Sequence, residues 1–375
     1  MQSTRLDFLA NFPQNQQLNA LCKDVYPHFN ALNPAIIQTL QEDSVRLSQR
    51  LGKAHCEMFR FSAGDFLSLF CALYAHQYKI ALCPSLHQQS FYAGKLFERI
   101  APDALYWIYL GQKGTLKSSG ENSIESAIKA GANVFFIPLI NQDILTINPI
   151  ESLLKTLQTH IPDFIAFIDI SMQLSFLNTQ ILTSLMRINH PQILWLVNAE
   201  NIGLAPCNGA MFFSQSLYDD KRHTRLLEDI SALNLWQEHF FESFDCALMQ
   251  ILAQEPIVDS KHLFYQTLQR HLGENLDTFA SLDDTPPNAL PLRLKNIKAR
   301  TLIQALSVEQ IFAINGQDCL FGKAKPSFVL QTMGYEEKHC RELLSVSYRH
   351  LEPHQIAIIT QKIAFAYHQI IQLHL

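Results

Sequence analysis

The chain has 375 residues, of which 48% are hydrophobic and 17% are charged, and its formal net charge is −5. This composition excludes a disordered chain, and the length predicts one large domain with a smaller one. The charged residues form no basic run, so the sequence predicts no nucleic-acid partner.

The distribution of apolar residues and cysteines predicts a cytoplasmic protein. Arg5, Asp7 and Asn11 interrupt the amino-terminal residues, which therefore lack the apolar core of a signal peptide. The longest apolar runs, such as residues 134–140, are far shorter than the roughly 20 residues that span a bilayer. Eight cysteines occur without a C-x-x-C pair, which favours reduced thiols over a disulfide framework or a zinc site. We expect no membrane segment and no bound metal.

Short apolar runs alternate with helical patterns over the first 213 residues. The runs predicted as buried strands are residues 80–83, 105–110, 134–140, 164–169, 193–198 and 210–213. Amphipathic helices are predicted near residues 36–51, 124–128 and 150–157. This alternation predicts an α/β fold with a mixed, mostly parallel sheet flanked by helices, in which ligands bind beyond the carboxyl ends of the strands.

The carboxyl-terminal third of the sequence indicates a second, smaller unit. Residues 281–291 are polar and contain prolines, which predicts a surface loop. Pro353 opens an amphipathic final helix. We therefore predict a large α/β domain at residues 14–255. The predicted small α+β domain combines residues 1–13 and 256–375 and contains a cysteine loop at residues 315–326.

Five segments, the first of them LDFLANFP at residues 6–13, resemble in chain order those of the NifS-type cysteine desulfurases, within the class V aminotransferase-like family. The segment NGQDCLFGKAKPSFVLQTMG, residues 315–334, resembles the family's catalytic-cysteine loop and the P-S-x-V-L-x-x-x-G pattern that follows it. The other segments are SAGDF at 62–66, NQDILTINPI at 141–150 and NAENIGLAPCNGAM at 198–211. The resemblance implies fold type I of the pyridoxal-phosphate-dependent transferases and a homodimer.

The resemblance also assigns the family's site positions. Cys319 falls on the sulfur-accepting cysteine, Asp169 on the aspartate that holds the cofactor's pyridine nitrogen, and His87 within one residue of the ring-stacking histidine. The remaining cofactor positions are Gln142, Gly64, Asp65 and Asn198. The residues alone leave other interpretations open: a turn or cap aspartate at 169, an ordinary partly buried histidine at 87 and an inert thiol at 319.

Substitutions at these positions predict a degenerate member of the family. Asn201 stands where the family has its Schiff-base lysine, and an amide is neither a nucleophile nor a base. Glu200 replaces the histidine before it, Asp65 puts a carboxylate at the phosphate position, and Ser345 lies near the position of the substrate-binding arginine. We expect a pseudoenzyme without pyridoxal phosphate. Its expected role is a binding or scaffold protein, or a sulfur-relay partner through Cys319 for a sulfur acceptor or an iron–sulfur scaffold protein.

Two other functions stay open at this stage. The first is an active pyridoxal-phosphate-dependent cysteine desulfurase or class V aminotransferase in which Lys323 or Lys325 replaces the missing lysine. The second, more remote, is nucleotide binding by residues 111–118, GQKGTLKS, which resemble a phosphate loop except that Leu116 occupies the second required glycine position.

Overall fold

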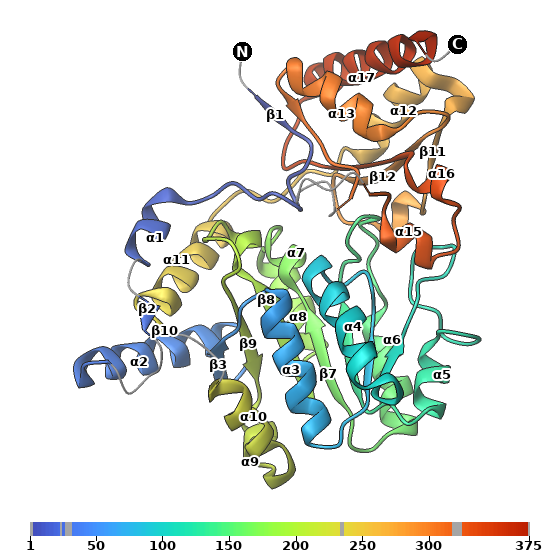
Figure 1. Ribbon diagram of the computed structural model, residues 1–375. Coiled ribbons are helices and arrows are strands. Elements are labelled where there is room, and N and C mark those ends of the chain that lie inside the picture. The colour runs from blue at the N-terminus through green and yellow to red at the C-terminus, as the bar shows by residue number, and fades with distance from the viewer. Residues whose placement is uncertain (1–2, 23–24, 27–31, 233–235, 317–324, 374–375) are drawn as a thin grey trace.

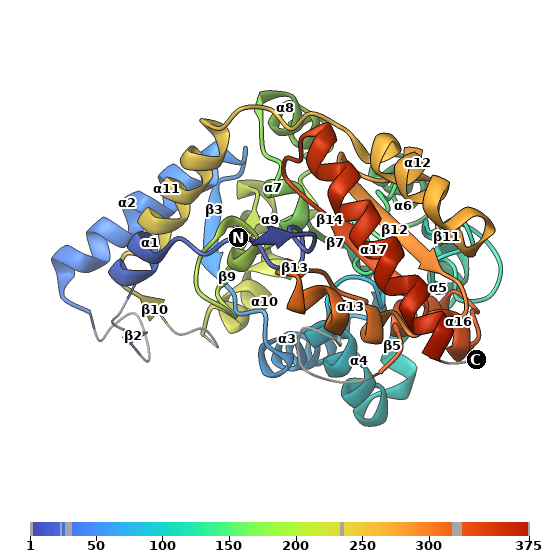
Figure 2. The same ribbon diagram turned by 90° about the horizontal axis from the view of Figure 1, so that it is seen from above.

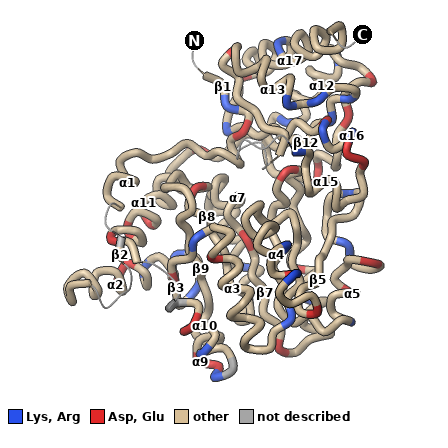
Figure 3. Tube along the Cα trace, in the orientation of Figure 1, with Lys and Arg blue, Asp and Glu red and all other residues tan. Residues whose placement is uncertain are grey.

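The computed structural model describes residues 3–22, 25–26, 32–232, 236–316 and 325–373. In these residues a larger lobe surrounds a seven-stranded sheet, and a smaller lobe with a three-stranded sheet lies above it in Figure 1. Acidic and basic residues are interspersed over both lobes (Figure 3). Within the described ranges, no helix is both long and apolar enough to cross a membrane.

The seven-stranded sheet confirms the predicted α/β architecture. Its order is β3-β9-β8-β7-β6-β4-β5; the pairs among β4 to β8 are parallel, whereas β9 pairs antiparallel with both β3 and β8. Residues along β6 alternate between two hydrophobic clusters, so the sheet is buried on both faces and its strands appear in the sequence as continuous apolar runs. The strands are β3 (His55–Met58), β4 (Ile80–Leu82), β5 (Leu105–Trp107), β6 (Val134–Pro138), β7 (Ile165–Asp169), β8 (Ile193–Asn198) and β9 (Gly209–Phe213).

Helices cover both faces of this sheet. One hydrophobic cluster is completed by α1 (Gln16–Leu21), α2 (Pro34–Arg50), α5 (Ile124–Lys129), α6 (Ile150–His160), α7 (Ser171–Leu174), α8 (Thr179–Arg187), the short 3-10 helix η3 (Ala199–Ile202) and α11 (Phe240–Leu252). The other is completed by α3 (Ala63–Ala75), α4 (Gln88–Ile100), η2 (Pro102–Ala104), α9 (Gln215–Asp219) and α10 (Lys221–Ala232). A small antiparallel pair, β2 (Val25–Tyr26) with β10 (Trp236–Gln237), lies apart from the main sheet.

The smaller lobe is an antiparallel sheet with helices packed against it. Its strand order is β11-β12-β14, and Figure 2 shows α17 crossing the top of this lobe. Leu6 is buried in the hydrophobic cluster between this sheet and its helices, which ties the amino-terminal segment to the smaller lobe. The elements are β11 (Leu276–Thr278), β12 (Ala289–Leu294), β14 (Leu343–Ser347), α12 (Lys261–Leu272), η4 (Gly273–Asn275), η5 (Leu282–Asp284), α13 (Ala299–Val308), α15 (Phe328–Thr332), α16 (Glu337–Cys340), α17 (Pro353–Leu373), and the parallel pair β1 (Thr4–Arg5) with β13 (Ile311–Phe312).

The predicted surface loop at residues 281–291 is wrong in its second half. Residues from Ala289 onward form β12, the central strand of the smaller sheet. Pro291 lies opposite Ser345, whose backbone N–H points away from β12 and donates to Ile314 O (2.8 Å). This is therefore a pair without hydrogen bonds between β12 and β14, and the missing N–H of Pro291 removes no bond between these two strands. Asn288 is fully buried, and its side chain donates to Val258 O (3.0 Å) and Arg349 O (3.2 Å).

The division into a large domain at residues 14–255 and a small domain formed by residues 1–13 and 256–375 stays a proposal, because two of the smaller hydrophobic clusters contain residues of both. Most of the cluster in the smaller lobe lies between Phe264 and Ile370, with Leu6 added from the amino terminus. The boundary at residue 255 stays a proposal.

Gly209→Ala should destabilise the fold. A Cβ on Gly209 would lie 2.5 Å from Val197 O and 2.8 Å from Phe59 O, and both contacts are with backbone that cannot move away cheaply. We expect a loss of about 1–3 kcal/mol in the free energy of unfolding, measured by urea denaturation. Gly64→Ala is the matched control, since its Cβ would approach only Ser62 Oγ, at 3.6 Å. Equal losses in both variants would contradict the packing argument.

Candidate functional site

Most of the predicted cofactor positions lie at one edge of the large sheet. Asp169 ends β7, Asn198 ends β8, His87 follows β4 and Gln142 follows β6. Because these strands are parallel, their carboxyl ends meet at the same edge, where ligands bind in open α/β sheets. The sheet therefore brings together residues that are far apart in the sequence.

Asp169 is held by its own turn. Its Oδ1 accepts hydrogen bonds from the backbone N–H of Ser171 (2.8 Å) and from the Ser171 hydroxyl, whose oxygen also accepts from Asn198 N (2.7 Å). Burial raises the pKa of Asp169 to about 6, partly opposed by these hydrogen bonds. None of the described residues donates to its other oxygen, Oδ2. Ser171, which no motif indicated, thus links the ends of β7 and β8.

Asn201 is a buried structural link. It lies in η3, directly after β8, and its Nδ2 donates to Leu9 O (2.7 Å). Its backbone carbonyl accepts from the Ser175 hydroxyl (2.8 Å), and Leu9 N in turn donates to Ser347 Oγ (2.9 Å). The residue to which the resemblance assigns the family's lysine position therefore joins η3 to the amino-terminal segment and, through it, to the smaller lobe.

His87 is the N-cap of α4 and is surrounded by phenylalanines. Its Nδ1 accepts from Gln89 N (3.2 Å), and its ring stacks on Phe66 (6.5 Å between centroids) and meets Phe61 edge-on (5.4 Å). Burial lowers the pKa of His87 to about 4, so the ring is neutral near pH 7. Phe66 therefore lies against the histidine to which the resemblance assigns ring stacking.

The first turn of α3, which contains Gly64 and Asp65, is capped from within the protein. The Ser62 side chain accepts from Asp65 N (3.1 Å), and its hydroxyl also bonds the Asp65 carboxylate. The backbone N–H of Ala63 donates to Gln89 Oε1 (3.2 Å). Side chains of the chain itself thus occupy donors with which a helix N-terminus would bind a phosphate.

Gln142 belongs to a buried region that also determines the conformation of residues 111–118. Gln142 N donates to Ser85 O (3.0 Å), and the neighbouring Asn141 side chain donates to Gly114 O (3.1 Å). In the phosphate-loop-like segment, Gly111 N and Gly114 N bond within the turn, and Leu116 N donates to the Asn148 side chain (3.2 Å). These amides are unavailable to a phosphate, which argues against the nucleotide-binding interpretation.

Cys319 and Lys323 lie outside the described residues, but the residues on either side of their segment are described. Asp143 contacts both sides: its Oδ2 accepts from the Ser327 hydroxyl (2.6 Å), and a Cβ on Gly316 would lie 2.8 Å from the same oxygen. Gly316 has φ +111°, a conformation that disfavours other residues. The Lys325 ammonium lies over the Tyr92 ring of α4, 5.9 Å from its centroid.

Cys207, a residue that no motif singled out, lies near this end of the larger lobe in a left-handed conformation (φ +64°). Its N–H donates to Glu200 Oε1 (2.7 Å). Desolvation raises the pKa of its thiol, and Glu200 and Asp65 raise it further, while Arg60 opposes them.

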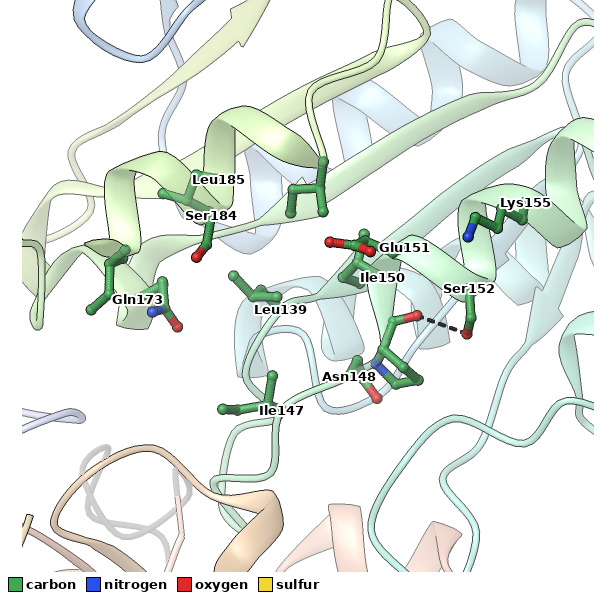
Figure 4. A pocket seen from close by; sticks show the side chains of 13 residues that line it. Leu139, Ile147, Asn148, Ile150, Glu151, Ser152, Lys155, Gln173, Ser184 and Leu185 are labelled. Atoms are coloured by element: carbon green, nitrogen blue, oxygen red, sulfur yellow. Dashed lines mark hydrogen bonds between the residues drawn. The ribbon is translucent and has the colours of Figure 1, made fainter. Parts of the chain in front are cut away.

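A separate groove of about 480 Å³ lies between α6 and α8. Figure 4 shows Leu139, Ile150 and Leu185 along it, with Glu151 and Lys155 from α6. It contains none of the residues predicted for the cofactor or for sulfur transfer. Within the described part of the chain, no three His, Cys, Asp or Glu side chains are grouped as metal ligands.

No family model and no curated protein matches the sequence, but solved structures match its fold. A NifS-like protein shares 12% identity with a TM-score of 0.67 over 97% of this chain and 99% of that one. A cysteine desulfurase from Thermococcus onnurineus matches at 11% identity and TM-score 0.65, over 98% and 95% of the two chains. The ureidoglycine–glyoxylate aminotransferase of Bacillus subtilis matches at 8% and 0.63, over 99% and 94%. The fold is therefore that of the fold type I transferases, as the sequence predicts.

Asp169→Asn should remove a pH dependence of stability. Because burial raises the pKa of Asp169 to about 6, the folded protein keeps this proton to a higher pH than the unfolded chain does. The wild type should therefore lose stability relative to the variant as pH rises from about 4 to about 7, by on the order of 3 kcal/mol. Urea unfolding of both proteins across this range measures the difference. Parallel stability curves would show that Asp169 titrates like an exposed aspartate.

Proposed function

We propose that this chain is a degenerate member of the cysteine desulfurase-like family that does not hold pyridoxal phosphate. It acts as a binding or scaffold protein, or as a sulfur relay through Cys319, in sulfur or iron–sulfur metabolism. The observation that carries the proposal is the Asn201–Leu9 hydrogen bond: the position that needs a reactive amine bears an amide engaged in a buried structural contact.

The cofactor's other contacts point in the same direction. A phosphate placed at the first turn of α3 would meet the Asp65 carboxylate and would have to displace Gln89 from Ala63 N. Next to His87, Phe66 occupies one side of the ring. These residues do not suit pyridoxal phosphate, although Asp169 retains an oxygen that could face a pyridinium nitrogen. Residue 201 bears no amine that could exchange with the amine of a substrate.

The alternative, an active enzyme that uses another lysine, depends on residues 323 and 325. Lys325 is described, and its ammonium faces Tyr92 of α4. Lys53 has a pKa lowered to about 7 by burial, yet it donates to Ile193 O (2.8 Å) at the amino end of β8. The site residues lie at the carboxyl end of that strand, roughly 16 Å away at about 3.3 Å per residue. Lys53 therefore does not support the alternative.

Protein reduced with borohydride as purified, without added pyridoxal phosphate, should yield no pyridoxyl-lysine peptide, because Asn201 offers no amine and Asp65 disfavours the phosphate. Peptide mass spectrometry provides the measurement, with an authentic cysteine desulfurase treated in parallel as the positive control. A pyridoxyl adduct at Lys323 or Lys325 that disappears in the matching Lys→Gln variant would establish the alternative. Cysteine-dependent sulfide release would independently refute the pseudoenzyme proposal.

The sulfur-relay role depends on the reactivity of Cys319. The seven described cysteines are the thiols with which that reactivity is compared. Desolvation raises the pKa of each of these seven thiols, to about 11 for Cys83 and about 12 for Cys340. Cys207 and Cys246 are exposed, but nearby carboxylates raise their pKa further. A thiol near Lys323 and Lys325 has a sequence environment that favours the thiolate, partly opposed by Asp318.

Limiting iodoacetamide should therefore alkylate Cys319 faster than any other cysteine of the native protein. Peptide mass spectrometry measures the labelled fraction at each of the eight positions. Cys319→Ser is the test variant and Cys246→Ser the matched exposed control; only the first should abolish persulfide formation from a sulfur donor. If Cys207 or Cys246 reacts as fast as Cys319, the relay loses its chemical support and a scaffold role remains.

We also propose a cytoplasmic location and a homodimer, both of which rest on the sequence and on the resemblance. Light scattering at tens of micromolar should give twice the mass of one chain. A mass of one chain at that concentration would refute the homodimer. A monomer would not affect the proposal for Asn201, because the Asn201 contacts all lie within one chain.

A further inference from the structure

A second hollow, with a volume of about 510 Å³, lies where the two lobes join. Its walls come from Phe8 and residues 12–17, from Ile202, from the carboxyl-terminal half of α11 with Gln254 just after it, and from Arg349 just beyond β14. Figure 1 shows the amino-terminal segment at α1 beside α11, below the smaller lobe, and the Asn15–Gln250 hydrogen bond joins the two. None of Asp169, His87, Asn198 and Asn201 lines it, so it is distinct from the strand-end site.

Arg349 supplies the charge of this hollow. Its Nη2 donates to Glu255 O (3.3 Å), and no described carboxylate lies within ion-pair distance of its guanidinium. The side chain is partly buried, and burial lowers its pKa without any opposing carboxylate. The backbone at Arg349 is fixed, because its carbonyl accepts from the buried Asn288 side chain. A fixed, partly desolvated guanidinium is complementary to a planar anion.

The remaining lining is neutral. It contains no acidic residue and no lysine, but several carboxamides, including those of Gln14, Asn15, Gln250 and Gln254. Asn15 Nδ2 donates to Gln250 Oε1 (2.7 Å), which ties the amino-terminal segment to α11 and leaves Gln250 Nε2 without an acceptor among the described residues. Phe8 and Phe12, with centroids 5.1 Å apart, add an apolar wall.

We propose that this hollow binds a small organic carboxylate that also carries an amide and an apolar group. The carboxylate pairs with Arg349, the amide meets the carboxamide side chains, and the apolar group packs on Phe8 and Phe12. A single cation in a neutral lining matches a monoanion better than a phosphate. Because the walls come from both lobes, the ligand would hold the lobes in one relative orientation. The proposal is independent of the role of Cys319.

Hippurate is a suitable probe, since it has a carboxylate, an amide and a phenyl ring. Saturation-transfer NMR on the full chain should detect its binding, and a titration gives the Kd. Arg349→Gln should weaken binding roughly tenfold or more, because an ionic hydrogen-bonded pair is lost. Arg341→Gln is the matched control: Arg341 pairs with Glu337 on α16, away from the hollow, and its variant should bind as the wild type does. Hippuramide, the neutral analogue, should bind as weakly as hippurate binds to Arg349→Gln.

A second variant keeps the test decisive if Arg349→Gln does not fold. Gln250 is exposed on α11, so Gln250→Trp should fill the hollow with Arg349 intact and abolish the hippurate signal. Three outcomes overturn the proposal: wild type that gives no hippurate signal at the solubility limit, a Kd that is unchanged in Arg349→Gln, and hippuramide that binds as tightly as hippurate.

Discussion

The hydrogen bond from Asn201 to Leu9 O is the contact on which the arrangement around the strand ends depends. Asn201 Nδ2 fixes Leu9, and Leu9 N reaches Ser347 Oγ at the end of β14. Ser347 N and O also bond Leu6 O and Phe8 N, so the amino-terminal segment is fastened to the smaller lobe along its length. Ser175 completes the connection by donating to Asn201 O. A lysine at residue 201 could donate to Leu9 O only by giving up its freedom to react, so structural and catalytic uses of this position exclude each other.

Buried polar groups need hydrogen-bond partners, and this requirement explains both the Asn201 contact and the first turn of α3. A helix N-terminus has free N–H donors that a phosphate can satisfy. In this chain Ser62 and Gln89 satisfy two of them, and the Asp65 carboxylate adds a negative charge in the first turn. This turn needs no bound anion, because Ser62 and Gln89 already accept from its N–H groups and the Asp65 carboxylate already opposes the positive end of the helix dipole. Residues 65 and 201, to which the resemblance assigns cofactor contacts, therefore agree with each other, because each makes its contacts within the protein.

Much of the fold could be predicted because both faces of the large sheet are buried. Strand β8 was predicted at its observed bounds, and Pro353 marked the start of α17. The edge strand β3 was not predicted, because the partly exposed His55 and Glu57 break the apolar run. Proline and polar residues likewise concealed β12, whose pairing depends on β14 some fifty residues later.

The candidate site was predictable as a set of positions but not as a set of contacts. Asp169 and Asn198 were predicted at the carboxyl ends of strands in a mostly parallel sheet, where ligands bind, and Asn201 follows three residues after Asn198. Their partners could not be inferred, since Leu9 lies 192 residues from Asn201 and Gln89 lies 26 residues from Ala63. The Ser62–Asp65 contact was an exception, because a serine followed three residues later by an acid is a recognisable helix-capping pattern. Local caps can be found from sequence, whereas long-range bonds that close a site require the fold.

Lys53 shows why a perturbed pKa alone does not identify a reactive group. Its ammonium is buried over the Trp195 ring, and burial lowers its pKa to about 7, the range that amine chemistry requires. Its donors are directed at the backbone carbonyls of Ile193 and His190, which close the amino end of β8. Just beyond the carboxyl end of the same strand, Asn201 holds the position to which the resemblance assigns the lysine and bears an inert amide. The amine with a pKa of about 7 and the proposed site therefore lie at opposite ends of one strand, and no side-chain rotation can bring them together.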